Sequence, residues 1–266
     1  MAEPPGIDMT PVVFSDGVAG CFYMPKEDRN LPLVVWLGPF QVSQGYAAPF
    51  YRCAFPAPAV LLCEGFPVFA YDPIGTFLRQ NERRDFFSKA PDASLMAKMV
   101  CDARHAIDAA QQALKKPRPI ALYGYAMGGM TAIFTAALDE RVSAAACVAG
   151  FTPLRSDTSD KRTGGIARLS HLYGWLPRLG AFIGREDRIP VDFPEILASI
   201  APRRLLIVAP ELDRYATHGD VLAAAEYARG AYRMLGAENA FEIRTPFDEN
   251  RLTDAMQNEA IEWLKP

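Results

Sequence analysis

Residues typical of metal, redox and disulfide chemistry are scarce in this sequence. Its 266 residues include only three histidines and five cysteines. The cysteines form no Cys-x-x-Cys pair and are odd in number, so we interpret them as buried free thiols. They are Cys21, Cys53, Cys63, Cys101 and Cys147. None stands at a sharp turn or a helix start, where a catalytic thiolate is expected. We therefore expect no metal and no cofactor.

Long apolar runs and an excess of one charge are also missing. No apolar run approaches the roughly 20 residues that a helix needs to span a bilayer. The first residues, Met1-Ala-Glu-Pro-Pro5, lack the pattern of a signal peptide. The net charge of −3 gives no reason to expect a nucleic acid partner. We expect a cytoplasmic protein with a small-molecule substrate and no nucleic acid or membrane partner, and we leave a homodimer open.

What the sequence does contain is the composition of one large globular domain, with 50% hydrophobic and 22% charged residues. Apolar runs predict strands at residues 12–14, 18–23, 33–37, 66–71, 119–123, 143–149, 204–209 and 241–244. Helical patterns follow at residues 94–114, 127–138, 218–235 and 253–264. Strands alternating with helices at these lengths predict an α/β fold with a doubly wound, mostly parallel sheet.

One segment, residues 151–194, interrupts this alternation. It is far longer than an ordinary connection between a strand and a helix. Long insertions in compact domains are usually binding loops or lids. We therefore predict a core formed by residues 1–150 and 195–266, with residues 151–194 as a cap insertion over the functional site.

The most specific local pattern is Gly124-Tyr-Ala126-Met-Gly128-Gly129, directly after the predicted strand at 119–123. It has the form of the Gly-x-Ser-x-Gly nucleophile elbow, in which small flanking residues let a strand turn tightly into a helix. Alanine stands at the position of the serine. Because alanine has no hydroxyl group, acyl-enzyme chemistry is excluded for this chain.

Together with Tyr71-Asp-Pro-Ile-Gly75 and the run from Ala201 to Asp213, this motif resembles the α/β-hydrolases over about residues 12–264. More narrowly, it resembles the dienelactone-hydrolase-like and bacterial esterase branch. The resemblance implies an ester hydrolase whose nucleophilic serine is replaced by Ala126. It also implies an acid at Asp213 and a histidine in the loop after the last strand, although residues 245–251 contain none.

The base of the triad must then come from elsewhere in the chain. His105 lies off the apolar stripe of its predicted helix, so we interpret it as a solvated residue. His171 lies in the predicted cap and His218 just after Asp213. Both are candidates for the base, each with a structural alternative, and Asp213 has the alternative of a capping or loop aspartate.

An oxyanion hole is expected at the start of the helix after the elbow. The backbone N–H of Met127 lies there, where the helix dipole favours negative charge. The second donor is expected in the loop after residue 37. Since Pro39 has no N–H, this donor is Phe40 or Gln41.

Basic residues surround the same predicted cleft. Residues 151–188 carry seven Lys or Arg against four Asp or Glu, and Arg79, Arg83 and Arg84 follow the strand that ends at Tyr71. This distribution favours an anionic ligand, and surface ion pairing is the alternative. The substrate-binding candidates are Tyr125, Asp72, Arg79, Arg83, Arg168 and Trp175.

Three functions stay open at this point. The first is an ester hydrolase inactivated by an engineered Ala126, for which Ala126→Ser should restore cleavage. The second is a natural lyase, isomerase or cyclase that uses His171, Asp72, Tyr125 and the arginines. The third is a catalytically inactive binding protein for a small ligand. A histidine near the Cβ of Ala126 that also contacts Asp213 would favour the first.

Overall fold

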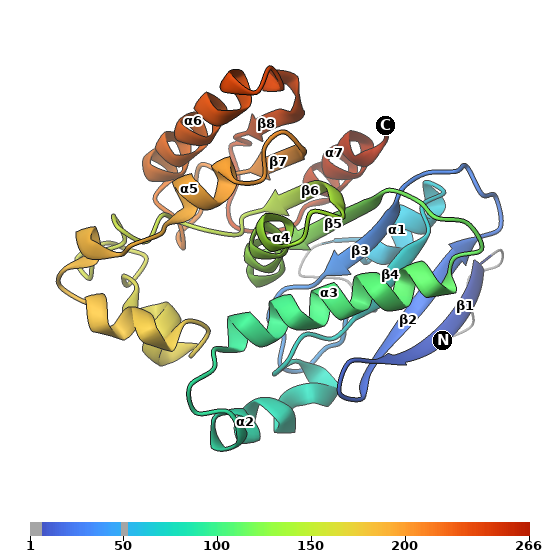
Figure 1. Cartoon of the computed structure of the whole chain (residues 1–266), viewed down its shortest axis with the longest axis horizontal. Helices are drawn as coiled ribbons and strands as arrows, with labels where there is room; N and C mark the ends of the chain where they lie inside the picture. The colour runs from blue at the N-terminus through green and yellow to red at the C-terminus, as the bar shows by residue number, and fades with distance from the viewer. Residues whose placement is uncertain (1–6, 49–52) are drawn as a thin grey trace.

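An eight-stranded sheet runs through the residues that the computed structural model describes, 7–48 and 53–266 (Figure 1). Its strands are β1 (Ile7–Phe14), β2 (Val18–Pro25), β3 (Leu33–Leu37), β4 (Val68–Tyr71), β5 (Ile120–Tyr125), β6 (Val142–Val148), β7 (Arg204–Val208) and β8 (Phe241–Arg244), in the spatial order β1-β2-β4-β3-β5-β6-β7-β8. β1 and β2 form an antiparallel hairpin at one edge, and β2 is antiparallel to β4. All other neighbours are parallel. The predicted doubly wound, mostly parallel sheet is confirmed.

Helices cover both faces of this sheet (Figure 1). They are α1 (Ala57–Cys63), α2 (Gln80–Lys89), α3 (Leu95–Ala113), α4 (Met127–Leu138), α5 (Phe193–Ala198), α6 (His218–Met234) and α7 (Asp254–Leu264). Successive side chains of a strand point to opposite faces. Accordingly, Leu33 and Val35 of β3 pack in one core cluster with α3 to α6, whereas Val34 packs in a second cluster with α1 and α7.

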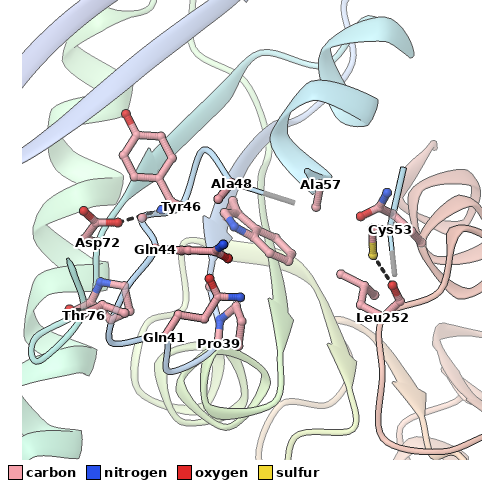
Figure 2. Close-up of a pocket in the computed structure, with 15 residues that line it drawn as sticks. Pro39, Gln41, Gln44, Tyr46, Ala48, Cys53, Ala57, Asp72, Thr76 and Leu252 are labelled. Carbon is pink, nitrogen blue, oxygen red and sulfur yellow. Dashed lines mark hydrogen bonds between the residues drawn. The ribbon is translucent and has the colours of Figure 1, made fainter. Parts of the chain in front are cut away.

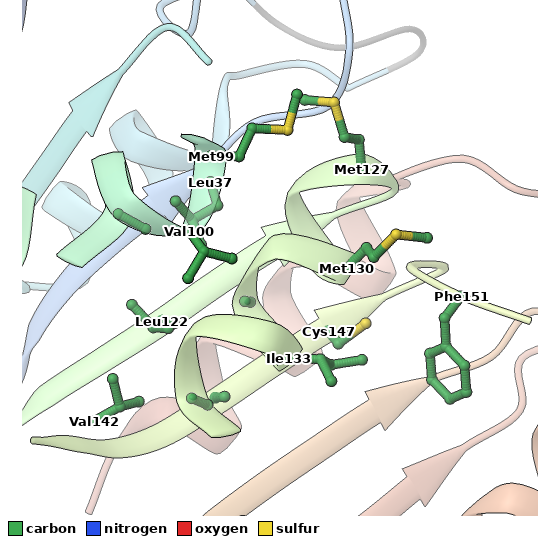
Figure 3. Packing of buried hydrophobic residues seen from close by; sticks show 14 of the residues in the cluster. Leu37, Met99, Val100, Leu122, Met127, Met130, Ile133, Val142, Cys147 and Phe151 are labelled. Atoms are coloured by element: carbon green, nitrogen blue, oxygen red, sulfur yellow. The ribbon is translucent and has the colours of Figure 1, made fainter. Parts of the chain in front are cut away.

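Helix α3 follows the predicted amphipathic pattern. The hydroxyl of Ser94 accepts a hydrogen bond from the N–H of Ala97 at 3.0 Å and so caps the start of the helix. Most of the predicted stripe is buried: Met96, Met99, Val100, Ala103, Ile107 and Ala110. This face packs on α4, where Figure 3 shows Met99 beside Met127.

The charged stretch at residues 76–92, which contains none of the predicted strands or helices and was therefore expected to be a loop, is partly helical. A 3-10 turn (Phe77–Arg79) leads directly into α2. No residue of α2 is fully buried. Without a buried face the helix leaves no apolar periodicity in the sequence, which explains the error.

The cysteines are free thiols, but not all are buried. Cys21 and Cys147 are buried, Cys53 is half-buried, and Cys63 and Cys101 are exposed. The prediction of buried thiols is therefore wrong for the last two. Cys63 ends α1 and Cys101 lies on the outer face of α3, so their apolar sequence neighbours point the other way.

Residues 151–194 connect β6 to the start of α5 mainly through turns and short helical segments. These are a π-helical turn at Arg168–Leu172 and 3-10 segments at Pro177–Phe182 and Glu186–Arg188. The segment, yellow to orange in Figure 1, lies across the molecule from the β1–β2 hairpin. We call it the insertion segment. Among the described residues, no helix is long and apolar enough to cross a membrane.

Candidate active site

The turn between β5 and α4 has the backbone of a nucleophile elbow. Ala126, between the two elements, has φ +52° and ψ −118°, a conformation that non-glycine residues rarely adopt. A Cβ on Gly128 would lie 1.8 Å from the carbonyl oxygen of Leu37, and one on Gly124 would lie 2.2 Å from that of Gly128. The two glycines therefore allow the close approach that the turn requires. The elbow has this strained geometry with alanine at the position of the serine.

A cleft of about 370 Å³ opens over Ala126. Its walls come from the loop after β3, the ends of β5 and β6, the insertion segment, and the loops after β7 and β8. Of the residues predicted for the site, it brings together Ala126, Met127, Phe40, Tyr125, Asp213, Arg168 and Trp175. Met127 and Met130 of α4 and Phe151 of the insertion segment connect the cleft to the core beneath (Figure 3).

Asp213 lies in this cleft, in the loop after β7, and is only 9% exposed. Its Oδ1 accepts a hydrogen bond from the N–H of Tyr215 at 2.7 Å, and its Oδ2 accepts one from Nδ2 of Asn250 at 2.8 Å. Burial raises the pKa of the Asp213 carboxyl group, and these two hydrogen bonds partly oppose the shift.

Asn250 is the site residue that the sequence reasoning missed. It belongs to the loop at residues 245–251, where the resemblance implies a histidine. Its Oδ1 accepts a hydrogen bond from the hydroxyl of Tyr125 at 2.9 Å while its Nδ2 donates to Asp213. The amide therefore lies beside Asp213, in the loop for which the resemblance implies a histidine. The absence of a histidine from that loop was the available signal, but nothing singled out Asn250 as its replacement.

None of the three histidines, all of which the structure describes, lines the cleft. His171 is exposed, with its Nδ1 2.8 Å from the hydroxyl of Ser170. His218 begins α6 and borders a separate cavity of about 10 Å³ that Asp213 also borders. His105 is exposed, with its Nδ1 3.0 Å from the hydroxyl of Ser15. The geometry therefore gives Ala126 no neighbouring imidazole base.

The two predicted sources of the second oxyanion donor are separated. Phe40 lines the cleft, as does Met127 at the first position of α4. Gln41 lines a different cavity of about 20 Å³, together with Asp72 (Figure 2). There Oδ1 of Asp72 accepts the N–H of Tyr46 at 2.7 Å, and burial raises the pKa of the Asp72 carboxyl group. Asp72 is thus outside the cleft that contains Ala126.

Among the predicted arginines, Arg79 serves the fold. Its guanidinium is 2.8 Å from the fully buried carboxylate of Asp102 and 2.6 Å from Glu82, and it donates to the carbonyl oxygen of Asp72. A buried carboxylate needs such a partner because an isolated charge is costly in the protein interior. Arg79 does not line the cleft.

The other two arginines lie closer to the cleft. Arg83 donates to the carbonyl oxygen of Tyr173 at 3.0 Å and lies over the ring of Phe40, so it supports two lining residues from behind. Arg168 lines the cleft itself and donates to the carbonyl oxygen of Tyr215 at 3.1 Å. Trp175, stacked on Tyr173 with ring centroids 4.4 Å apart, completes an aromatic wall.

The sheet, the elbow and the acid after β7 define an esterase-type α/β-hydrolase fold. The family model described as glucuronyl esterase, fungi, matches residues 81–236, more than half of the sequence, and the chain belongs to this family. The predicted α/β-hydrolase superfamily is confirmed, and the family model gives the branch as the glucuronyl esterases.

Solved structures agree with the fold at low sequence identity. A glucuronoyl esterase from Solibacter usitatus is similar with a TM-score of 0.71 and 15% identity, over 99% of this chain and 86% of that chain. A glucuronoyl esterase from Teredinibacter turnerae is similar with a TM-score of 0.70 and 15% identity, over 97% of this chain and 73% of that chain. An esterase from Pyrococcus furiosus is similar with a TM-score of 0.61 and 14% identity, over 97% of this chain and 91% of that chain. No curated protein matches the sequence.

Proposed function

We propose that this chain binds a small ligand in the cleft over Ala126 and does not hydrolyse it. The observation that carries the proposal is the hydrogen bond from Asn250 to Asp213. Serine hydrolysis needs a hydroxyl nucleophile and an imidazole that removes its proton. Ala126 lacks the first and Asn250 cannot act as the second, because a side-chain amide takes up no proton near neutral pH.

The hypothesis of an esterase inactivated by one engineered substitution is weakened by this second departure. Replacing a serine at position 126 would account for Ala126 alone. It would leave a parent protein in which Asn250 still stood beside Asp213. The proposal of a binding protein needs no additional assumption, since the elbow, the acid and the cleft are all present.

The lyase, isomerase or cyclase alternative gains little from the geometry. It relied on His171 and Asp72 for acid–base chemistry, and both lie outside the cleft. Tyr125 stays in reach, but burial raises the pKa of its hydroxyl well above the usual range. A hydroxyl with a raised pKa is a poor base at neutral pH.

The ligand class follows from the family and from the charge of the cleft. Several of the similar structures are glucuronoyl esterases, so uronic acids and their esters are the first ligands to test. Arg168 on the cleft wall favours an anionic one. A cytoplasmic location and the absence of nucleic acid and membrane partners stay part of this proposal.

The test combines a binding and a turnover measurement on the same protein. We expect uronic acids or their esters to raise the melting temperature, because a ligand at about 100 times its Kd stabilises a fold by about 2.7 kcal/mol. We expect no methanol release from methyl glucuronate, followed by NMR over long incubation. Methanol release above the buffer rate that disappears in Asp213→Asn would overturn the proposal.

A further inference from the structure

We infer that the cleft selects a free carboxylate over the corresponding ester, and that Asn250 and Arg168 are the residues that recognise it. This inference rests on the proposed binding function and names the form of the ligand. The natural ligand would then be the acid that an ester hydrolase releases, not the ester that it cleaves.

The first step concerns the orientation of the Asn250 amide. The hydroxyl of Tyr125 donates to its Oδ1 and the carboxylate of Asp213 accepts from its Nδ2, so both ends of the amide are fixed. One hydrogen of Nδ2 is used in this contact. The second has no partner among the described residues, and Asn250 lines the cleft. In the place of a base, the cleft therefore has a hydrogen-bond donor.

The second step concerns charge. Two cations line the cleft, Arg168 and Arg251. Arg251 is paired with Asp248 at 2.6 Å. Arg168 has no carboxylate within 4.0 Å in the part of the chain that the structure describes, and its Nε makes no hydrogen bond there. It is held by the carbonyl oxygen and the ring of Tyr215. A fixed guanidinium that makes no salt bridge among the described residues, and that the carboxylates of Asp213 and Asp157 influence only through space, is suited to a ligand carboxylate.

The third step concerns the floor of the cleft. Ala126 and Met127 line the cleft at the start of the 12-residue helix α4. Helix starts favour negative charge. A carboxylate placed here would face the Met127 N–H, and the donors from Asn250 and Arg168 line the same cleft.

Asp213, the one acidic residue among the described residues that line the cleft, does not cancel this preference. Both oxygens of Asp213 already accept hydrogen bonds, from Tyr215 and from Asn250. The amide of Asn250 therefore covers one of its oxygens. A ligand carboxylate can pair directly with the Arg168 guanidinium, which a neutral ester cannot do, whereas the carboxylates of Asp213 and Asp157 act on that guanidinium only through space.

Isothermal titration with glucuronate and with methyl glucuronate at neutral pH tests the inference. We expect the acid to bind at least about tenfold more tightly, as charge-assisted hydrogen bonds are roughly twice as strong as neutral ones. Arg168→Met and Asn250→Asp should each weaken binding of the acid by about tenfold or more and change binding of the ester by less than about threefold. Matched controls are Arg162→Met and Asn258→Asp, both at exposed positions outside the cleft.

The outcomes separate the two proposals. Equal affinity for acid and ester, or equal losses for both ligands in Arg168→Met, would overturn the preference for a carboxylate and leave the non-hydrolytic binding function standing. Conversely, methanol release that depends on Asp213 would overturn the binding function. Variants that melt at the wild-type temperature show that a lost affinity reflects the contact and not the fold.

Discussion

Asn250 donates a hydrogen bond from Nδ2 to Oδ2 of Asp213 at 2.8 Å, so the residue predicted as the acid of a hydrolase triad is joined to an amide. In a working triad the acid orients an imidazole that accepts and returns a proton. An amide in the same place can still be oriented by the acid, but it cannot accept and return a proton as an imidazole does. In the proposed binding protein, this pair orders the Asn250 side chain in a cleft that none of the three histidines lines.

The first prediction follows from this pair. Ala126→Ser alone should show ester cleavage close to the buffer rate, because the new hydroxyl has no base. The double variant Ala126→Ser with Asn250→His should cleave p-nitrophenyl acetate about 10²-fold faster than the single variant, the lower end of what general-base catalysis contributes. Release of p-nitrophenol measures both, with Asn250→His alone as the control.

Substantial cleavage by Ala126→Ser alone would contradict this expectation. It would mean that another group removes the proton of the serine. That result would also support the hypothesis of an esterase inactivated by one engineered substitution.

Much of the fold was predictable because burial leaves periodic patterns in the sequence. The apolar run at residues 33–37 became the fully buried strand β3, and the stripe of residues 94–114 became α3. The helix α2 was missed for the same reason, since no residue of it is fully buried. The elbow could be predicted because a Cβ on Gly124 or Gly128 would collide with the backbone, and this requirement for glycine leaves a short pattern in the sequence.

The residues of the site were predictable only where neighbours in the sequence determine the backbone conformation. Ala126 and Met127 follow directly from the elbow. The contact between Asp213 and Asn250 joins two loops, and no periodicity relates them. His171 was considered for the cleft because it lies in the insertion segment, but that irregular segment gives no rule for which way its side chain points.

The second prediction concerns the strained backbone at the elbow. Ala126→Gly should stabilise the fold by roughly 1 kcal/mol, because a sparsely populated conformation costs about 1–3 kcal/mol and glycine loses about 0.5–1 kcal/mol of entropy on folding. Ala136→Gly in α4, where the alanine is buried and helical, should instead cost about 1–2 kcal/mol. Urea unfolding compares the two; a loss of stability in both would show that position 126 is unstrained.

The third prediction concerns close packing at the elbow. Gly128→Ala should destabilise the fold by about 3 kcal/mol or more, since its methyl group would meet the backbone of Leu37 at 1.8 Å. Gly230→Ala in α6 has open space around the added methyl group and should gain up to about 1 kcal/mol from helix propensity. Melting temperatures measure both changes, and a fully stable Gly128→Ala would contradict the tight turn.

The fourth prediction separates a structural arginine from a ligand-binding one. Arg79→Met should destabilise the fold by about 1–3 kcal/mol, because it removes one of the two cations at the buried carboxylate of Asp102 and leaves Lys98 at 2.9 Å as the other. Ligand affinity, measured while the variant is folded, should stay within about threefold of the wild type, because Arg79 is outside the cleft. Arg84→Met, at an exposed position, should change neither. A loss of ligand affinity in Arg79→Met without a loss of stability would show that Arg79 binds the ligand.

The fifth prediction concerns Asp157, which is fully buried in the insertion segment. Its Oδ1 accepts a hydrogen bond from the hydroxyl of Thr163, whereas its Oδ2 has no partner among the described residues. Burial raises its pKa above the ordinary 3.8, against the opposing effects of Thr163, Arg168 and Lys161. A carboxyl group with a raised folded-state pKa favours the fold below pH 3.8, and this contribution is lost as the pH rises through the folded-state value.

Asp157→Asn removes that titration, so the variant should be more stable than the wild type at pH 7 and nearly equal to it near pH 3. Asp160→Asn is the matched control with the opposite sign, because the hydroxyl of Thr158 lowers the pKa of the exposed Asp160 carboxyl group. That variant should lose a little stability at pH 7 and none at low pH. Free energies of unfolding measured between pH 3 and pH 8 compare the two curves. A gap between Asp157→Asn and the wild type that stays constant across this range would show that the Asp157 carboxylate is not penalised by its burial.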